Sequence, residues 1–323
     1  MIIKNVILTT SKRVSDIQSG FMAGRGCVDQ IFTLRQLVEK QLSVRRKLFT
    51  AFVDLEKAFD SVDRGMLWDV LKAYGVNGAL LGAVHANYEN STACVRIDDE
   101  YSEWFEVFKG VRQGCVMSPW LFNIVMDKCV RDARLDDCGL MIGESKVSVL
   151  LYADDAVLVS DSAVEFQTML SRLNKALLGN YLKLNARKTK VLIFERNEEN
   201  TNYEFRINGM NVDAVNEFVY LGSMFEKDAR MTGEFERRVM KGRCVLGATA
   251  CIAMNQNLSK NVRLAVHGGI LVPTLMYGSE AWTVSEREIS KVHTVEMDYL
   301  RSMIGKKRSD RVRNDFVREE CGV

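Results

Sequence analysis

Two adjacent acids, Asp154 and Asp155, are the residues of this sequence best suited to chemistry. They follow Tyr152-Ala153 and stand between two apolar runs, 147–151 and 156–159. Two short strands joined by a tight turn would bury both runs and leave the carboxylates at a wet, anionic tip. Carboxylates this close repel one another, so a divalent cation is expected there. The alternative is a turn that uses Asp only for its turn-forming tendency.

A third acid, Asp54, ends the apolar run 48–53, which is typical of a buried strand. If this strand pairs with the hairpin, three carboxylates meet at one edge of a sheet. Such a cluster can hold two divalent ions, which activate an attacking hydroxyl and stabilise a leaving pyrophosphate. Hard oxygen ligands favour Mg²⁺, with Mn²⁺ as a substitute.

The loop from Gly110 to Pro119 is a third block of interest. Its glycines permit close approach of a backbone, and Gln113 offers both a donor and an acceptor to a nucleotide or template. Arg112 could face a phosphate. The alternative is an ordinary loop that leads into a helix started by Pro119.

These residues need a framework of mixed helices and strands to bring them together. Apolar periodicity and capping residues predict helices at 28–42, 63–75 (capped by Asp63 and stopped at Gly75), 119–135 and 162–178. Besides the hairpin, strands are predicted at 48–54, 92–97, 103–108 and 189–194. A polar excursion over 195–202 and a β segment ending at 218–222 follow, and the chain from about 233 is predicted to be mostly helical.

Composition excludes several classes of protein. The 323 residues are 47% hydrophobic and 27% charged, as in a globular protein of two or three domains. A net charge of +2 means that any surface for nucleic acid must be local. No long apolar run or leader is present, so we expect no membrane span and an intracellular location, in nucleus or cytoplasm, rather than secretion. Eight scattered cysteines without a C-x-x-C pair predict neither a zinc site nor a disulfide framework.

Six blocks in order resemble the reverse transcriptases of non-LTR retrotransposons. They are Gln18–Cys27, Phe52–Val62, Gly110–Pro119 with Leu121-Phe122-Asn123, Tyr152–Asp155, Leu184–Lys190 and Tyr220–Ser223. One such block would be a weak signal, but six in the family's order are specific.

The resemblance implies an α+β, right-hand polymerase fold with a palm sheet. Partial fingers would occupy 1–47, the palm 48–225 and a helical, thumb-like region 226–323. The implied activity is RNA-directed DNA polymerisation, by two-metal nucleotidyl transfer to a primer 3′-OH. The implied partners are an RNA template, a DNA primer and deoxynucleoside triphosphates, while the oligomeric state stays open.

The resemblance also assigns roles to residues around the nucleotide. Asp54, Asp154 and Asp155 match the metal-binding triad, and Tyr152 belongs to the same block. Phe59 matches a bulky gate that would clash with a ribose 2′-OH, although it could equally be a core residue. The implied substrate-binding set is Phe59, Arg112, Gln113, Gly114 and Tyr152.

Other matched residues would act on the leaving group and on the nucleic acid. Lys188 or Lys190 would donate a proton to pyrophosphate or neutralise its charge, and the sequence does not choose between them. Tyr220, Leu221 and Gly222 match the hairpin that grips the primer end. In the helical tail, phosphate contacts are expected from Arg237, Arg238, Lys241 and Arg243, with a second basic cluster over 301–313. Solvated helix faces are the alternative for both clusters.

The sequence departs from the family at its start. Only seventeen residues precede Gln18, and none matches the fingers segment that binds the triphosphate. We therefore expect a truncated fragment of a larger polyprotein, with a weakened hold on the nucleotide. A non-catalytic remnant that binds nucleic acid at most is the main alternative. A palm-fold nucleotide cyclase is another, but it does not account for Gln113-Gly114 or for Tyr220–Gly222.

Overall fold

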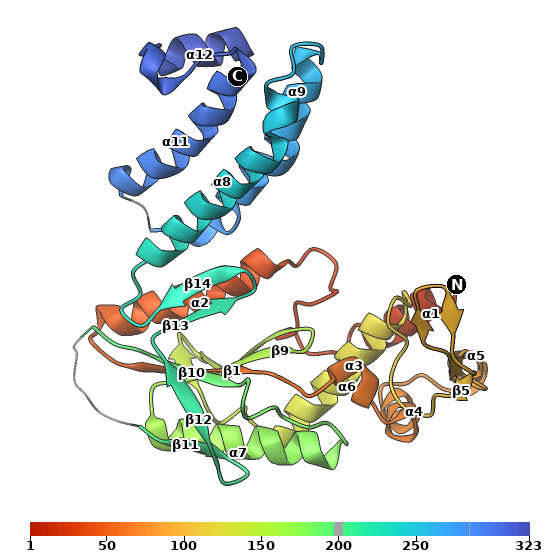
Figure 1. The fold of residues 1–323 in the computed structure, drawn as a ribbon. Helices are drawn as coiled ribbons and strands as arrows, with labels where there is room; N and C mark the ends of the chain where they lie inside the picture. The colour runs from red at the N-terminus through yellow and green to blue at the C-terminus, as the bar shows by residue number, and fades with distance from the viewer. Residues whose placement is uncertain (197–202, 284) are drawn as a thin grey trace. The chain divides into compact units, whose positions relative to one another are not determined.

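The computed structural model describes residues 1–196, 203–283 and 285–323 (Figure 1). They form two compact units, Met1–Asn216 and Glu217–Val323. The first unit holds the acids and a large sheet, and the second is mainly helical.

The first unit is built on a six-stranded sheet in the order β11-β12-β10-β1-β9-β8. All six residues of the central strand β1 are buried, which explains why five of them are apolar; the sixth, Thr50, donates its hydroxyl to the Leu192 carbonyl at 2.6 Å. β1 runs antiparallel to β9 on one side and to β10 on the other. The strand bounds are β1 Leu48–Val53, β8 Val149–Tyr152, β9 Asp155–Ser160, β10 Lys190–Phe194, β11 Phe205–Ile207 and β12 Met210–Val215.

Helices cover both faces of this sheet. α2 (Cys27–Ser43) packs against β8 and β1, and α7 (Ala163–Gly179) packs against β9 and β11. Figure 1 shows α2 and α7 on opposite faces, and α6 (Ser118–Ala133) packs beside α7. Because side chains alternate along a strand, Phe49 and Val53 enter the core shared with α6 and α7.

Short elements complete the first unit. The Asp63 side chain accepts a hydrogen bond of 2.8 Å from the Met66 backbone N–H and so caps the helix that follows. The remaining helices are α1 Ile2–Thr10, α3 Ala58–Ser61, α4 Arg64–Ala73 and α5 Gly78–Ala86. Three two-stranded ladders pair β2 (Thr92–Ala93) with β5 (Phe105–Glu106), β3 (Arg96–Ile97) with β4 (Glu100–Tyr101), and β6 (Leu140–Ile142) with β7 (Ser145–Val147).

The second unit begins with a hairpin of β13 (Glu217–Tyr220) and β14 (Ser223–Glu226) and continues as helices. α8 (Thr232–Ala253) packs on α11 (Glu286–Met303) around Phe235, Leu275 and Leu300. A Cβ at Gly242 of α8 would lie 2.4 Å from Leu275 Cδ2 and 3.2 Å from Val295 Cγ1 of α11, so glycine lets these segments approach. The other segments are α9 Lys260–Val266, a π turn His267–Leu271, α10 Val272–Met276, 3₁₀ turns Ser279–Ala281 and Arg308–Asp310, and α12 Asn314–Cys321.

The predicted α+β class is confirmed, and so are the main helices and the strands that surround the acids. Two predicted strands, 92–97 and 103–108, are wrong as continuous elements. They are broken into the two-residue strands β2 to β5. Side chains such as Ile97 and Trp104 are 70% exposed, so a longer strand would gain no stabilisation from packing against a core. α1, α5 and the β6–β7 ladder were not predicted.

The described structure does not decide some of the predictions. In the polar excursion predicted over 195–202, residues 197–202 lie outside the described part of the chain. The unit boundary at Asn216/Glu217 is a division by packing, and the functional boundaries after 47 and 225 stay predictions. No helix among the described residues is long and apolar enough to cross a membrane.

The β6–β7 ladder offers a matched pair of glycines for a stability test. Gly139 has φ +99°, and a Cβ there would lie 2.3 Å from the Val147 carbonyl oxygen, whereas a Cβ at Gly143 (φ +62°) would meet nothing within 4 Å. Both alanine variants carry left-handed strain, but only Gly139→Ala adds a clash with backbone. We expect urea unfolding to give a loss of about 3 kcal/mol for Gly139→Ala and about 1 kcal/mol for Gly143→Ala. Equal losses would contradict the close approach at Gly139.

Candidate active site

The turn between β8 and β9 presents the two adjacent acids. Tyr152 pairs with Asp155, which leaves Ala153 and Asp154 as a two-residue turn. Asp154 is partly exposed and Asp155 is exposed, so the tip of the hairpin reaches solvent as the sequence predicted. Ala153 has φ +56°, which is a left-handed conformation that suits this type of hairpin.

The register of β1 with β9 brings the third acid to the same place. The last pair in this ladder is Val53 with Ala156, so Asp54, one residue further, continues opposite Asp155. Directly opposed residues of an antiparallel pair share a face and lie about 4.5–5.5 Å apart at Cα. Asp54, Asp155 and Tyr152 therefore share one face at the end of these strands, with Asp154 in the turn beside them.

The segment before β10 fixes the backbone of Asp54. The Asp54 N–H donates to Thr189 Oγ1 at 3.2 Å, and the Asn185 N–H donates to the Asp54 carbonyl at 2.8 Å. The Asp54 Oδ2 atom is buried and has no hydrogen-bond partner among the residues that the structure describes. A buried carboxylate oxygen without a partner is costly, unless a ligand supplies the missing contact.

Burial, followed by mutual repulsion, raises the pKa of the two turn acids. Partial burial, then the charges of Asp154 and Asp54, raise the pKa of Asp155 to about 6. Burial, together with the charge of Asp54, also raises the pKa of Asp154. A cation near these carboxylates would relieve the repulsion and favour their ionised forms.

The donor atoms at this place fit a hard divalent cation. They are carboxylate oxygens, and one of them, Asp54 Oδ2, accepts no hydrogen bond from the described part of the chain. Within the described ranges, no three or more His, Cys, Asp or Glu side chains form a ready-made metal cage. Mg²⁺ seldom needs one, because it is usually held by one or two carboxylates, waters and substrate phosphates.

The Gly110–Pro119 loop packs against the segment that follows Asp54. Gly110 N–H donates to the Val62 carbonyl at 2.8 Å, and Val111 N–H donates to the Phe59 carbonyl at 2.9 Å. A Cβ at Gly110 would lie 2.9 Å from the backbone of Asp60, which explains the glycine. Backbone hydrogen bonds therefore hold the Gly110–Pro119 block against the Phe52–Val62 block that contains Asp54.

Within this loop, the predicted substrate-binding residues differ in how exposed they are and in whether other protein groups bind them. Gln113 is exposed and its Nε2 donates to Asp60 Oδ1 at 3.0 Å. A Cβ at Gly114 would meet nothing within 4 Å, so this glycine borders open space. Arg112 donates to Ser91 Oγ at 2.9 Å and lies over the Tyr88 ring, 5.7 Å from its centroid. The protein itself therefore holds Arg112.

Phe59 lies half-buried just beyond Asp54 in the chain. Its ring stacks on that of Phe122, with centroids 4.7 Å apart and planes 13° apart. The ring is thus fixed by the core while part of it stays exposed, so both predicted readings, gate and core residue, fit its position.

The two lysines between which the sequence did not choose are placed differently. Lys190 Nζ lies 2.6 Å from Asp213 Oδ2 and donates to the Arg187 carbonyl. Lys188 is exposed in the preceding turn, and among the described residues its ammonium has no ion-pair or hydrogen-bond partner. Lys188 is the lysine available to a ligand.

In the second unit, the turn of the β13–β14 hairpin is held from behind. Leu221 and Gly222 have φ +44° and +84°, as in a type I′ turn. Tyr277 donates to the Leu221 carbonyl at 2.7 Å, and both Arg237 and Arg238 donate to the Gly222 carbonyl. Buried Glu234 binds the same two arginines. Tyr220 is buried at the end of β13.

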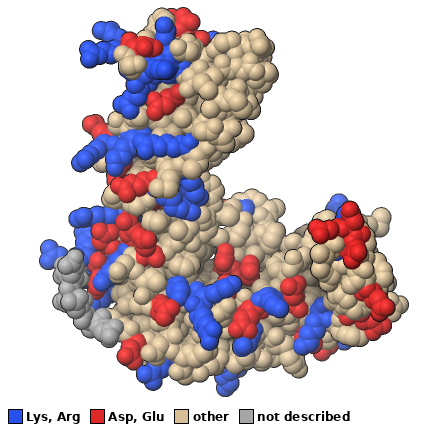
Figure 2. All heavy atoms as spheres, in the orientation of Figure 1, with Lys and Arg blue, Asp and Glu red and all other residues tan. Residues whose placement is uncertain are grey.

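The basic residues predicted to contact phosphate thus divide into two groups. Arg237 and Arg238 are occupied by the hairpin, and Arg238 is only 3% exposed. Lys241 and Arg243, one turn along α8, are exposed. Figure 2 shows lysine and arginine side chains interspersed with acids on the visible face of this helical unit.

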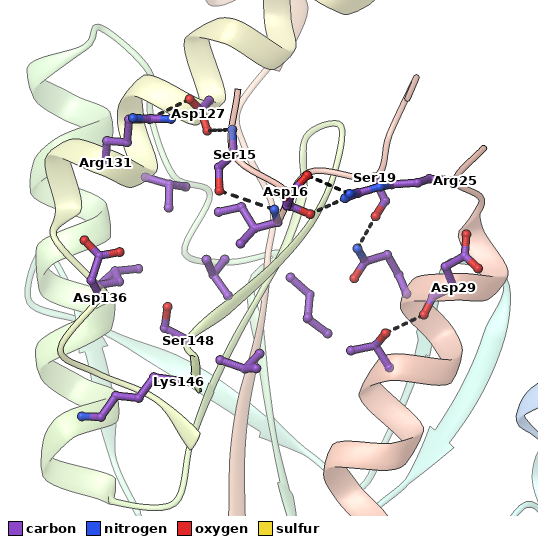
Figure 3. A pocket seen from close by; sticks show the side chains of 18 of the residues that line it. Ser15, Asp16, Ser19, Arg25, Asp29, Asp127, Arg131, Asp136, Lys146 and Ser148 are labelled. Carbon is purple, nitrogen blue, oxygen red and sulfur yellow. Dashed lines mark hydrogen bonds and ion pairs between the residues drawn. The ribbon is translucent and has the colours of Figure 1, made fainter. Parts of the chain in front are cut away.

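Sequence reasoning missed the residues that hold the acids in place. Thr189 and Asn185 bond the backbone of Asp54, and Gln18 bonds the backbone of Ala153. All three residues lie inside the motif blocks matched in the sequence, so the blocks pointed to them. The sequence of a block, however, does not indicate which backbone groups its side chains bind. A cavity of about 770 Å³ between α2, α6 and β8 lies behind the segment 15–19 and contains none of the three acids (Figure 3).

The family model described as reverse transcriptase (RNA-dependent DNA polymerase) matches residues 1–225. The Pol polyprotein of the retrotransposable element R2DM of Drosophila melanogaster is 32% identical over 171 residues, which cover 53% of this chain and 16% of that protein. The RNA-directed DNA polymerase of the mobile element jockey, from the same fly, is 22% identical over 316 residues, 94% of this chain and 34% of its own length.

Among solved structures, apo telomerase from Candida tropicalis matches with a TM-score of 0.49 and 12% identity, over 94% of this chain and 54% of that one. The chain spans about a third or less of the two retroelement proteins.

The raised pKa of Asp155 makes a prediction about stability in metal-free buffer. An acid whose folded pKa exceeds its unfolded pKa, about 3.9, favours folding below pH 4, and this contribution is lost as the pH rises through about 6. We therefore expect Asp155→Asn to raise the melting temperature at pH 7.5, by about 2 °C, and to leave it unchanged at pH 4. Thermal melts with EDTA would measure this. The exposed Glu103→Gln is the control, and an equal effect of Asp155→Asn at both pH values would contradict the charge cluster.

Proposed function

The chain belongs to the reverse transcriptase (RNA-dependent DNA polymerase) family, and we propose that it extends a primer 3′-OH on an RNA template with deoxynucleoside triphosphates. The resemblance to non-LTR retrotransposon enzymes drawn from the ordered motifs is confirmed by the matches to R2 and jockey proteins. The mixed helix and sheet fold agrees with the right-hand polymerase fold of this family.

One observation carries the proposal to this chain's own residues. The register of β1, β9 and β8 gathers Asp54, Asp154 and Asp155 at one sheet end, and Asp54 Oδ2 is buried there without a hydrogen bond from any described residue. Three carboxylates placed this close repel one another and destabilise the fold. A bound cation accounts for such an arrangement better than the turn-forming tendency of Asp does.

Divalent metal is the general requirement of this family, and we assign its site to the three acids. Asp54, Asp154 and Asp155 would hold two Mg²⁺ ions, with Mn²⁺ as a substitute. When bound, such ions activate an attacking hydroxyl and stabilise a leaving pyrophosphate. The acids must be ionised to hold a cation. Asp155 meets this condition at pH 7 even without metal, because its raised pKa, about 6, is still below that pH.

The nucleotide would lie against the loop that packs on Phe59. Gln113 and Gly114 border open space, so they can reach a nascent base pair. Arg112, held by Ser91 and Tyr88, would face phosphate with its remaining N–H groups, and Tyr152 would line the same face as Asp155. Lys188 would neutralise or protonate pyrophosphate, since Asp213 occupies Lys190.

The nucleic acid would meet the second unit in two ways. Tyr220, Leu221 and Gly222 would grip the primer end, and Arg237 and Arg238 would support that turn from behind through the Gly222 carbonyl. The exposed Lys241 and Arg243 would bind phosphates by charge, independently of sequence.

Primer extension on an RNA template, with Mg²⁺ or Mn²⁺, tests the proposed activity. We expect the chain to extend the primer and the Asp154→Asn/Asp155→Asn variant to lose activity by about a thousandfold or more, because the cation site is gone. Folding is checked by far-UV circular dichroism, and RNA–DNA binding by a filter assay. A folded, nucleic-acid-binding chain with no product above the variant would establish the alternative, a non-catalytic binding protein.

The gate assigned to Phe59 is tested by substrate choice. We expect Phe59→Val to raise the use of ribonucleotides relative to deoxynucleotides by about tenfold or more, because the smaller side chain leaves room for a 2′-OH. The ratio of kcat/KM for the two substrates measures this. Phe166→Val, which shortens a fully buried ring on α7, is the control for loss of packing. An unchanged ratio in an active Phe59→Val enzyme would make Phe59 a core residue only.

A further inference from the structure

The turn that presents the two acids contains a strained residue. Ala153 adopts φ +56°, a conformation that costs a residue with a side chain about 1–2 kcal/mol. Such strain persists only where the surroundings over-determine the backbone. Ala153 is 5% exposed, so what surrounds it is protein.

One side chain takes up both backbone polar groups of this residue. Gln18 is fully buried, and its Oε1 accepts from the Ala153 N–H at 2.9 Å while its Nε2 donates to the Ala153 carbonyl at 3.2 Å. The same Oε1 accepts from the Gly20 N–H at 2.8 Å. A primary amide offers an acceptor and a donor side by side, which neither a carboxylate nor an apolar side chain can do.

The chain around Gln18 lies directly against the hairpin. Ser19 N–H donates to the Leu151 carbonyl at 2.9 Å, and Leu151 N–H donates to the Ile17 carbonyl at 3.2 Å, as in a short parallel strand. A Cβ at Gly20 would lie 2.2 Å from the Ala153 nitrogen. We call residues 17–20 the splint, because they follow the outer edge of β8 up to its turn.

The splint and the two residues before it are anchored on their other side, around the cavity of Figure 3. Ser15 N–H donates to Asp127 Oδ1 at 2.9 Å, and the Arg25 guanidinium lies 2.9 Å from Asp16 Oδ1 (Figure 3). Gln30 Nε2 donates to Ser19 Oγ at 2.6 Å. At its end, the buried Asn123 donates to the Gly20 carbonyl at 2.7 Å. The turn therefore rests on α2 and α6 through the splint.

We propose that Gln18 is a positioning residue, whose amide holds the Ala153–Asp154 turn in the conformation that keeps Asp154 and Asp155 together with Asp54. The assignment of these acids as the metal site rests on the proposed function. The three like charges push the turn apart, and Ala153 gains by leaving the left-handed region. The two Gln18 bonds and the bonds of the splint to Leu151 oppose both tendencies.

The test separates positioning from general stability by measuring metal affinity. Gln18→Met keeps the length of the side chain and removes its hydrogen bonds. Gln41→Met, which removes a buried amide on α2 that is 7% exposed, is the matched control. Ala153→Gly removes the left-handed strain, because glycine adopts positive φ readily. Binding of Mn²⁺ is titrated by electron paramagnetic resonance, thermal stability by circular dichroism, and kcat and KM for deoxynucleotide by primer extension.

We expect Gln18→Met to weaken Mn²⁺ binding by about tenfold or more, and Gln41→Met to weaken it by less than about twofold. The double variant Gln18→Met/Ala153→Gly should recover at least part of the loss, since the turn then needs less support. In primer extension, kcat should fall more than KM rises.

Other outcomes overturn the proposal. Equal Mn²⁺ affinities of Gln18→Met and Gln41→Met at matched stability would make Gln18 a structural residue only, and so would a double variant no better than Gln18→Met. Absence of Mn²⁺ binding by the unmodified chain would remove the site itself. A Gln18-dependent Mn²⁺ site without primer extension would keep this inference and reject the polymerase, whereas active enzyme with Mn²⁺ affinity insensitive to Gln18→Met would do the reverse.

Discussion

The pairing of β1 with β9 is the constraint on which the site depends. β1 is buried along its whole length, and the pairing of Val53 with Ala156 leaves no freedom in where Asp54 emerges. A slip of one residue would turn every side chain of β1 to the other face and place Asp54 in the core. The apolar core of the sheet therefore determines the geometry of charged residues that it does not contain.

Burial and function oppose each other at the tip of this hairpin. Burial, and then the charges of the neighbouring carboxylates, raise the pKa of Asp154 and Asp155, which is unfavourable for the ionised acids in the absence of a cation. Stability lost there has to be supplied by neighbouring structure. The splint supplies part of it through backbone hydrogen bonds, and Thr189 and Asn185 supply more on the side of Asp54. The same arrangement recurs in the second unit, where Tyr277 and Arg238 hold the carbonyls of a left-handed turn.

Much of the fold could be predicted because its signals are local. A largely apolar run predicted β1, the Asp63 cap predicted the start of α4, and two apolar runs around a polar pair predicted the hairpin. The segment 92–108 could not be predicted well, because its apolar side chains are exposed and no core fixes the length of its strands. At the site, residue types identified the acids. The partners of Gln18 and Lys190 lie 135 and 23 residues away, so only the folded chain reveals them.

The exposed aromatic segment of the first unit has a consequence for solution behaviour. Trp104 and Phe108 are 70% and 74% exposed, and the strands around them are only two residues long. Large apolar side chains gathered in solvent favour contact between molecules. A net charge of +2 provides little colloidal repulsion against it. Self-association should therefore grow with protein concentration. Kinetic data from dilute samples and spectroscopic data from concentrated samples will then describe different populations, unless salt and protein concentration are matched.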